Sequence, residues 1–146
     1  MRACTVKAAL TPPYASCARG ANAREGNAMS RSTLFLEGVA NPGGYRDVSP
    51  QQLSQSAAQV RIVDVREPHE FNGDLGHIEG AELAPMGTFP AAASGWDRDV
   101  DVVLICRSGN RSGRVAAALA PLGFKGLMNL AGGMLAWNAA ALPVKR

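Results

Sequence analysis

The sequence contains few residues that bind metals or form disulfides: three cysteines, Cys4, Cys17 and Cys106, and two histidines, His69 and His77, among 146 residues. A structural zinc site needs paired ligands at short spacing, and the sequence has no C-x-x-C motif and no Cys/His cluster. An odd number of cysteines, two of them in a polar N-terminal stretch, does not fit a disulfide framework. We therefore expect neither a metal site nor a disulfide scaffold.

The sequence also lacks a long apolar run, and its excess of basic side chains is not spread evenly along the chain. No apolar stretch approaches the roughly 20 residues that cross a bilayer, so we expect no membrane partner. Residues 1–31 hold five of the 15 basic and one of the 12 acidic side chains, which leaves the rest nearly neutral. A nearly neutral domain implies no basic face, so we expect no nucleic-acid partner. Its charge also gives no indication of a large assembly, and we expect a monomer or weak dimer.

Residues 1–40 are rich in Ala, Ser, Asn, Gly and Arg and show no sustained hydrophobic period. We predict that they form a flexible, disordered N-terminal extension, followed by one domain over residues 41–146. The apolar stretch that ends at Leu10 is short and contains Lys7, which excludes a secretory signal. An organellar transit peptide and a true start at Met29 both fit. We favour the second, and hence a cytoplasmic location, because no amphipathic helix is evident.

In the remaining sequence, strand-like apolar runs alternate with helical segments. Ser49-Pro50 is a typical helix start and predicts a helix to about residue 58. Apolar, β-branched runs predict strands, and the segments between them predict helices. The strands are expected at 61–65, 102–105 and 127–130, and the other helices at 68–71, 90–96, 114–122 and 133–137. This alternation predicts an α/β fold with a mostly parallel central sheet flanked by helices.

Cys106 directly follows the apolar run 102–105, and parallel sheets bind ligands at the carboxyl ends of their strands. The loop continues as Arg107-Ser108-Gly109-Asn110-Arg111-Ser112, which can turn tightly with its N–H groups inward. Those N–H groups, a helix N-terminus and two arginines would lower the thiol pKa and bind an anion. A merely buried cysteine needs none of these features. We therefore interpret Cys106 as the catalytic nucleophile and residues 107–112 as its substrate-binding loop.

These residues resemble those of rhodanese-like domains. Besides the Cys106 loop, the resemblance rests on Val63-Asp64-Val65-Arg66-Glu67-Pro68-His69-Glu70-Phe71, on Gly76-His77-Ile78-Glu79-Gly80-Ala81, and on Leu130-Ala131-Gly132-Gly133 with Trp137. The segments occur in the family's order over about residues 45–142. Two departures lie outside the loop: a slightly longer stretch before His77, and Glu79 where the family often has proline.

The resemblance implies a single-domain sulfurtransferase of the thiosulfate sulfurtransferase type. Cys106 would take sulfane sulfur from thiosulfate or a persulfide donor and hold it as a persulfide within the loop. It would then pass the sulfur to cyanide, a thiol or a protein acceptor. Arg107 and Arg111 would bind the leaving oxyanion. No metal or organic cofactor is implied.

Two alternative functions stay open. Phosphatases and arsenate reductases of the related kind use Cys, five intervening residues and Arg, whereas Arg111 comes after four and Ser112 holds the sixth position. The shorter loop suits one sulfur atom better than a tetrahedral oxyanion. The other alternative is a non-catalytic or carrier module that binds a protein partner. A purely binding copy commonly lacks the nucleophile, which this chain retains.

Other polar and aromatic residues near the loop receive structural interpretations. We expect Arg66, Glu67 and Glu70 to form an ion-pair network that ties a strand to the next helix. His77 is interpreted as structural, because a thiolate with a lowered pKa needs no base. Trp96 could line the entrance to the site.

Overall fold

The computed structural model describes residues 31–146, which contain one six-stranded sheet. β2 (Val39–Asn41) is antiparallel to β3 (Tyr45–Val48), and every other neighbouring pair of strands is parallel. The α/β fold with a mostly parallel sheet is therefore confirmed. In spatial order the strands are β2 (Val39–Asn41), β3 (Tyr45–Val48), β7 (Gly126–Leu130), β6 (Asp101–Ile105), β4 (Arg61–Asp64) and β5 (Glu82–Leu83).

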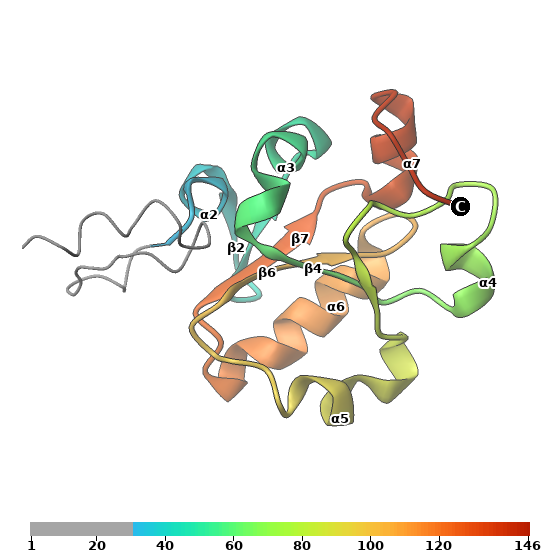
Figure 1. Ribbon diagram of the computed structural model, residues 1–146. Coiled ribbons are helices and arrows are strands. Elements are labelled where there is room, and N and C mark those ends of the chain that lie inside the picture. Colours follow the sequence, from blue (N-terminus) through green and yellow to red (C-terminus); the bar gives the residue numbers. More distant parts are fainter. Residues whose placement is uncertain (1–30) are drawn as a thin grey trace, which may run out of the picture. The chain divides into compact units, whose positions relative to one another are not determined.

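Helices cover both faces of the sheet, as Figure 1 shows. α5 (Phe89–Ala93) and α6 (Asn110–Leu119) pack on one face, and α2 (Thr33–Glu37), α3 (Pro50–Ser56) and α7 (Gly133–Ala139) pack on the other. The central strand β6 is buried throughout and serves both cores, because successive side chains point to opposite faces. Val102 and Leu104 pack toward α5 and α6, whereas Val103 and Ile105 pack toward α2, α3 and α7. The remaining elements are α4 (Pro68–Phe71) and the 3₁₀ turns η2 (Ala57–Gln59), η3 (Met86–Thr88) and η4 (Ala120–Leu122).

The predicted start of α3 is confirmed by its cap. The Ser49 hydroxyl accepts a hydrogen bond from the Gln52 N–H at 3.1 Å, and the Gln52 side chain accepts one from the Ser49 N–H at 2.9 Å. This reciprocal capping box pairs two N–H groups that have no partner inside the helix. Leu53, on the first turn, is then directed into the core.

The helix after the Cys106 loop begins earlier than predicted. We expected it at Arg114, but α6 begins at Asn110. Gly109 is the N-cap and has φ +99°, a left-handed conformation that reverses the chain without a Cβ clash. Arg111 and Ser112 therefore lie in the first turn of α6, not in an irregular loop.

The segment before residue 41 also contains secondary structure, although its composition predicts a disordered extension. α2 and β2 lie within the stretch 33–41, where an extension was expected, and the Leu34 side chain is fully buried. Residues 1–30 of the expected extension lie outside the described residues. Within residues 31–146, no helix is long and apolar enough to span a membrane.

Candidate functional site

Cys106 follows the carboxyl end of β6 and is 1% exposed. Its Sγ accepts hydrogen bonds from the Gly109 N–H at 3.0 Å and from the Ser112 hydroxyl at 3.3 Å. The predicted arrangement of a thiol held by its own loop at the start of a helix is therefore present.

These contacts set the acidity of the thiol. Burial alone raises the pKa of Cys106, because a thiolate loses hydration. The Ser112 hydroxyl and the N–H groups of Ser112, Gly109 and Ser108 act in the opposite direction and bring the pKa below its usual value of 9.0. Hydrogen bonds from the loop, one of the features expected to lower this pKa, are thus the main support of the thiolate.

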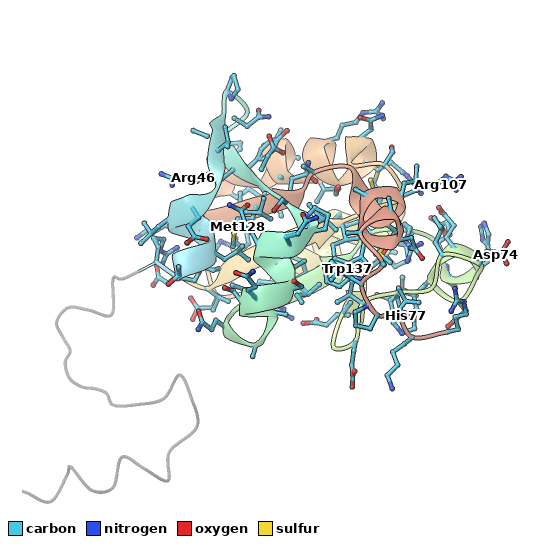
Figure 2. The ribbon with its side chains drawn as sticks, turned by 90° about the horizontal axis from the view of Figure 1, so that it is seen from above. Arg46, Asp74, His77, Arg107, Met128 and Trp137 are labelled. Carbon is cyan, nitrogen blue, oxygen red and sulfur yellow. The ribbon has the colours of Figure 1, made fainter. Side chains whose placement is uncertain are left out.

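The loop backbone is held in place by α7. The Met134 N–H donates to the Cys106 carbonyl at 2.9 Å, and the Leu135 N–H donates to the Arg107 carbonyl at 3.0 Å. The two ends of a peptide unit point in opposite directions. Fixing the Arg107 carbonyl on α7 therefore turns the Ser108 N–H toward Sγ. Figure 2 shows Arg107 beside this helix.

Gly133 allows α7 to approach the loop this closely. A Cβ on Gly133 would lie 2.5 Å from the Arg107 carbonyl carbon and oxygen and from the Cys106 oxygen. Real Cβ atoms essentially never come that close to backbone atoms, and Gly133 also has φ +58°. Gly133 is therefore part of the site, a role that its place at the start of a helix did not indicate.

The two arginines of the loop differ in their surroundings. Arg111 donates two hydrogen bonds to the Glu70 carboxylate on α4, at 2.9 and 2.8 Å. The Arg107 side chain is exposed, and no ion pair involves it within the described part of the chain. Arg107 is therefore the loop cation with no fixed counter-charge.

The ion-pair network expected among Arg66, Glu67 and Glu70 is wrong. Arg66 is 1% exposed and pairs with Asp64 at 2.7 Å, and it donates a further bond to the Gly76 carbonyl at 2.8 Å. Glu70 binds Arg111 instead and accepts a bond from the Glu67 backbone N–H. Two separate pairs result: one braces the end of β4, and the other ties α4 to α6.

The structure bears on the predictions for two aromatic residues, His77 and Trp96. His77 Nδ1 lies 2.8 Å from the Phe71 carbonyl, and its ring stacks on the Phe71 ring at 3.7 Å, contacts that fit the structural role. Trp96 does not line the site: its ring lies under Arg61, at the amino end of β4, and packs on Phe89. The chain must return to that end before a parallel strand can begin, which carries Trp96 away from Cys106.

One polar contact of the site was missed from the sequence. Asn129, on β7, accepts a hydrogen bond from Ser112 and is 5% exposed. The signal was available, because Asn129 is the single polar side chain of the buried strand Gly126–Leu130. Among residues 31–146, no three His, Cys, Asp or Glu side chains are grouped so that they could hold a metal ion.

Several curated proteins are similar to this chain. An uncharacterised protein of Synechocystis is 41% identical over 93 residues, a match that covers 64% of this chain but only 50% of that protein. A sulfurtransferase of Allochromatium vinosum is 38% identical, with 67% of this chain and 92% of that protein covered. The thiosulfate sulfurtransferase GlpE of Ectopseudomonas mendocina is 32% identical, with 65% and 86% covered.

Solved structures share the fold. A rhodanese-related protein from Thermoplasma volcanium matches with a TM-score of 0.62 and 27% identity, covering 68% of this chain and 96% of that one. A protein from Rhodopseudomonas palustris, described as of unknown function and a possible tyrosine phosphatase, matches with a TM-score of 0.63 and 26% identity, covering 69% and 85%.

The family profile of the rhodanese-like domain matches residues 49–140, a range that contains Cys106, its loop, and the α4 and α7 residues that hold it. With the mostly parallel sheet and the sulfurtransferases among its relatives, this match shows that the chain belongs to the rhodanese-like domain family.

Proposed function

We propose that this protein is a sulfurtransferase of the thiosulfate sulfurtransferase type, which carries sulfane sulfur as a persulfide on Cys106. The observation that carries the proposal is the set of hydrogen-bond donors around Cys106 Sγ, which come from Ser108, Gly109 and Ser112 and which we call the cradle. A sulfur nucleophile that is 1% exposed yet receives hydrogen bonds from Gly109 and Ser112 is prepared to be an anion.

The reaction takes place in two half-reactions. The Cys106 thiolate attacks the outer sulfur of thiosulfate and forms a new S–S bond, while the S–S bond of thiosulfate breaks and sulfite leaves with the electron pair. The negative charge then resides on the outer sulfur of the persulfide. A thiophilic acceptor such as cyanide, a thiol or a protein thiol attacks that sulfur and regenerates the Cys106 thiolate.

The charges around the loop suit an anionic donor. The exposed Arg107 guanidinium can bind the sulfonate end of thiosulfate and the departing sulfite. Arg111 is already paired with Glu70, at 2.8 Å, so much of its charge is offset before a donor arrives. We propose that Arg107 is the donor-binding cation and that Arg111 holds the loop in place.

A phosphatase activity is less well supported by the same geometry. An oxyanion hydrolase needs a guanidinium directed over the loop to hold the oxygens of the anion. Arg111 turns both terminal nitrogens to Glu70, and the sixth position is the buried Ser112, which binds Sγ. A role as a sulfur carrier for one protein partner is compatible with the proposal, because it uses the same persulfide.

The proposal is tested by the intact mass of the purified protein before and after incubation with thiosulfate. We expect a gain of one sulfur atom, about 32 Da, that cyanide removes, since the covalent intermediate accumulates without an acceptor. Cys106→Ser should show no gain, and the matched control, a double variant with Cys4→Ser and Cys17→Ser, should gain as the native protein does. No gain with thiosulfate or a glutathione persulfide, together with turnover of a phosphate ester, would overturn the proposal.

A further inference from the structure

The amide of Asn129 is the buried polar group nearest the loop that the mechanism above does not use. It lies on a strand whose other side chains are apolar, between the two cores of the sheet. A buried amide costs free energy unless its donor and acceptor atoms are paired, so each of its contacts restricts its orientation.

The partners of Asn129 fix which way its amide faces. Nδ2 donates to the Asp47 carboxylate at 3.1 Å and to the Gly109 carbonyl at 3.3 Å. Both partners can only accept a hydrogen bond, so the nitrogen must face them. The oxygen Oδ1 therefore faces Ser112, and the Ser112 Oγ lies 2.5 Å from it.

Ser112 has one hydroxyl proton and two partners that accept it. Its Oγ contacts Asn129 Oδ1 and also lies 3.3 Å from Cys106 Sγ, and the side chain is fully buried, so water cannot supply a second donor. When Cys106 is a thiol, its S–H can donate to Ser112, which donates to Asn129. When Cys106 is a thiolate, Sγ and Asn129 both require the same proton.

We propose that Asn129 is a positioning residue that competes with the Cys106 sulfur for the single proton of Ser112. The competition limits how strongly the hydroxyl stabilises the thiolate. Asn129 also remains an acceptor for the Ser112 hydroxyl once the Cys106 sulfur is no longer charged. In the persulfide, which rests on the proposed function, Sγ is neutral and the charge lies on the outer sulfur, so Ser112 can donate to Asn129 alone.

The test is the pH dependence of Cys106 alkylation by iodoacetamide, read on the Cys106-containing peptide of the full chain. Asn129→Leu, similar in size, removes the competing acceptor, and the Gly109 carbonyl keeps a bond from the Gly113 N–H at 3.1 Å. We expect the midpoint of alkylation to move to lower pH in Asn129→Leu and to higher pH in Ser112→Ala, since the two changes strengthen and remove the same bond.

The double variant separates this mechanism from a direct effect of the amide dipole. If Asn129 acts through Ser112, Asn129→Leu shifts the midpoint in the native protein but not in the Ser112→Ala background. An equal shift in both backgrounds, or a rise of the midpoint in Asn129→Leu, would overturn the proposal. Asn129→Ala removes the same acceptor and serves in its place if the leucine variant does not fold.

The other charged groups around the site keep their side chains in these variants. They are the Arg111–Glu70 pair from α6 and α4, the Asp64–Arg66 pair after β4, the exposed Arg107, and Asp47 on β3. Of them only Asp47 loses a contact, the Asn129 amide. A direct effect of the Asp47 charge on Cys106 would be the same with and without the Ser112 hydroxyl, so the double variant separates it from the proposed competition. Alkylation requires no sulfur donor. A failure of this inference is therefore distinguishable from a failure of the sulfurtransferase proposal, which the mass measurement tests.

Discussion

At the scale of single residues, the site depends on which charges and protons are already paired before a substrate binds. Arg111 and Glu70 satisfy each other across two helices, while Arg107 is left exposed. The single hydroxyl proton of Ser112 has two acceptors within reach, Cys106 Sγ and Asn129 Oδ1. The reactivity of Cys106 is thus set by hydrogen bonds within the loop more than by its net charge.

The Glu70–Arg111 pair predicts a stability difference that depends on pH. The two hydrogen bonds from Arg111 hold the pKa of Glu70 at about 2, below the usual 4.5. A lowered folded-state pKa contributes stability above the unfolded value, and that stability is lost as the pH falls through the folded value. Glu70→Gln should therefore be less stable than the native protein above about pH 4.5, and the difference should shrink toward pH 2.

The expected difference is small because both partners are partly exposed, 21% for Glu70 and 33% for Arg111. It should be about 1 kcal/mol or less, as for other exposed pairs. Urea unfolding at a series of pH values measures it. Glutamine keeps an oxygen that can accept the Glu67 N–H, so the start of α4 is maintained. A stability difference between the native protein and Glu70→Gln that grew as the pH fell would contradict the lowered pKa of Glu70.

At the scale of elements, the cradle is made by two helices rather than by one loop. The N-cap Gly109 and the first turn of α6 supply the donors that bind Sγ, and the first turn of α7 binds the loop carbonyls. Contact between the backbones of α7 and the loop requires a residue with no side chain at position 133. The site is therefore sensitive to a small displacement of α7.

Gly133→Ala tests this dependence. The added methyl group would meet three backbone atoms at 2.5 Å, so α7 must move away from the Cys106 and Arg107 carbonyls. Alanine at a left-handed φ costs about 1–2 kcal/mol in addition. We expect slower alkylation of Cys106 at neutral pH, at least tenfold slower sulfur transfer and lower stability. Gly95→Ala, where a Cβ meets nothing within 4 Å, is the matched control and should leave both rates unchanged.

The sequence predicted those parts of the candidate site's geometry that depend on local order along the chain. Cys106 and its loop followed from an apolar run that leads into small and polar residues. The pair Glu70–Arg111 spans 41 positions and Asp47–Asn129 spans 82. Such pairs depend on which strands become neighbours, and nothing local in the sequence states that β3 lies beside β7.

At the scale of the whole molecule, the folded unit extends beyond the segment that the family profile matches. The match begins at residue 49, whereas Leu34 on α2 is fully buried in the core with Val48, Leu53 and Leu130. A five-residue helix has no stability of its own, so α2 persists because this core accepts Leu34. Its start is capped by Ser32, whose hydroxyl accepts the Phe35 N–H at 3.1 Å.

Leu34→Ala should therefore lower the free energy of unfolding by about 3 kcal/mol, as other buried leucine truncations do. Leu36, on the same helix, is 62% exposed, and Leu36→Ala should change stability by less than about 0.5 kcal/mol. Urea unfolding of both variants makes the comparison. Because α2 packs chiefly on α3, β3 and β7, whereas α6 and α7 hold the Cys106 loop, the Cys106 alkylation rate of the folded protein should stay at the native value in both. Equal stabilities would instead mean that α2 contributes nothing to the core and that the folding unit coincides with the family match.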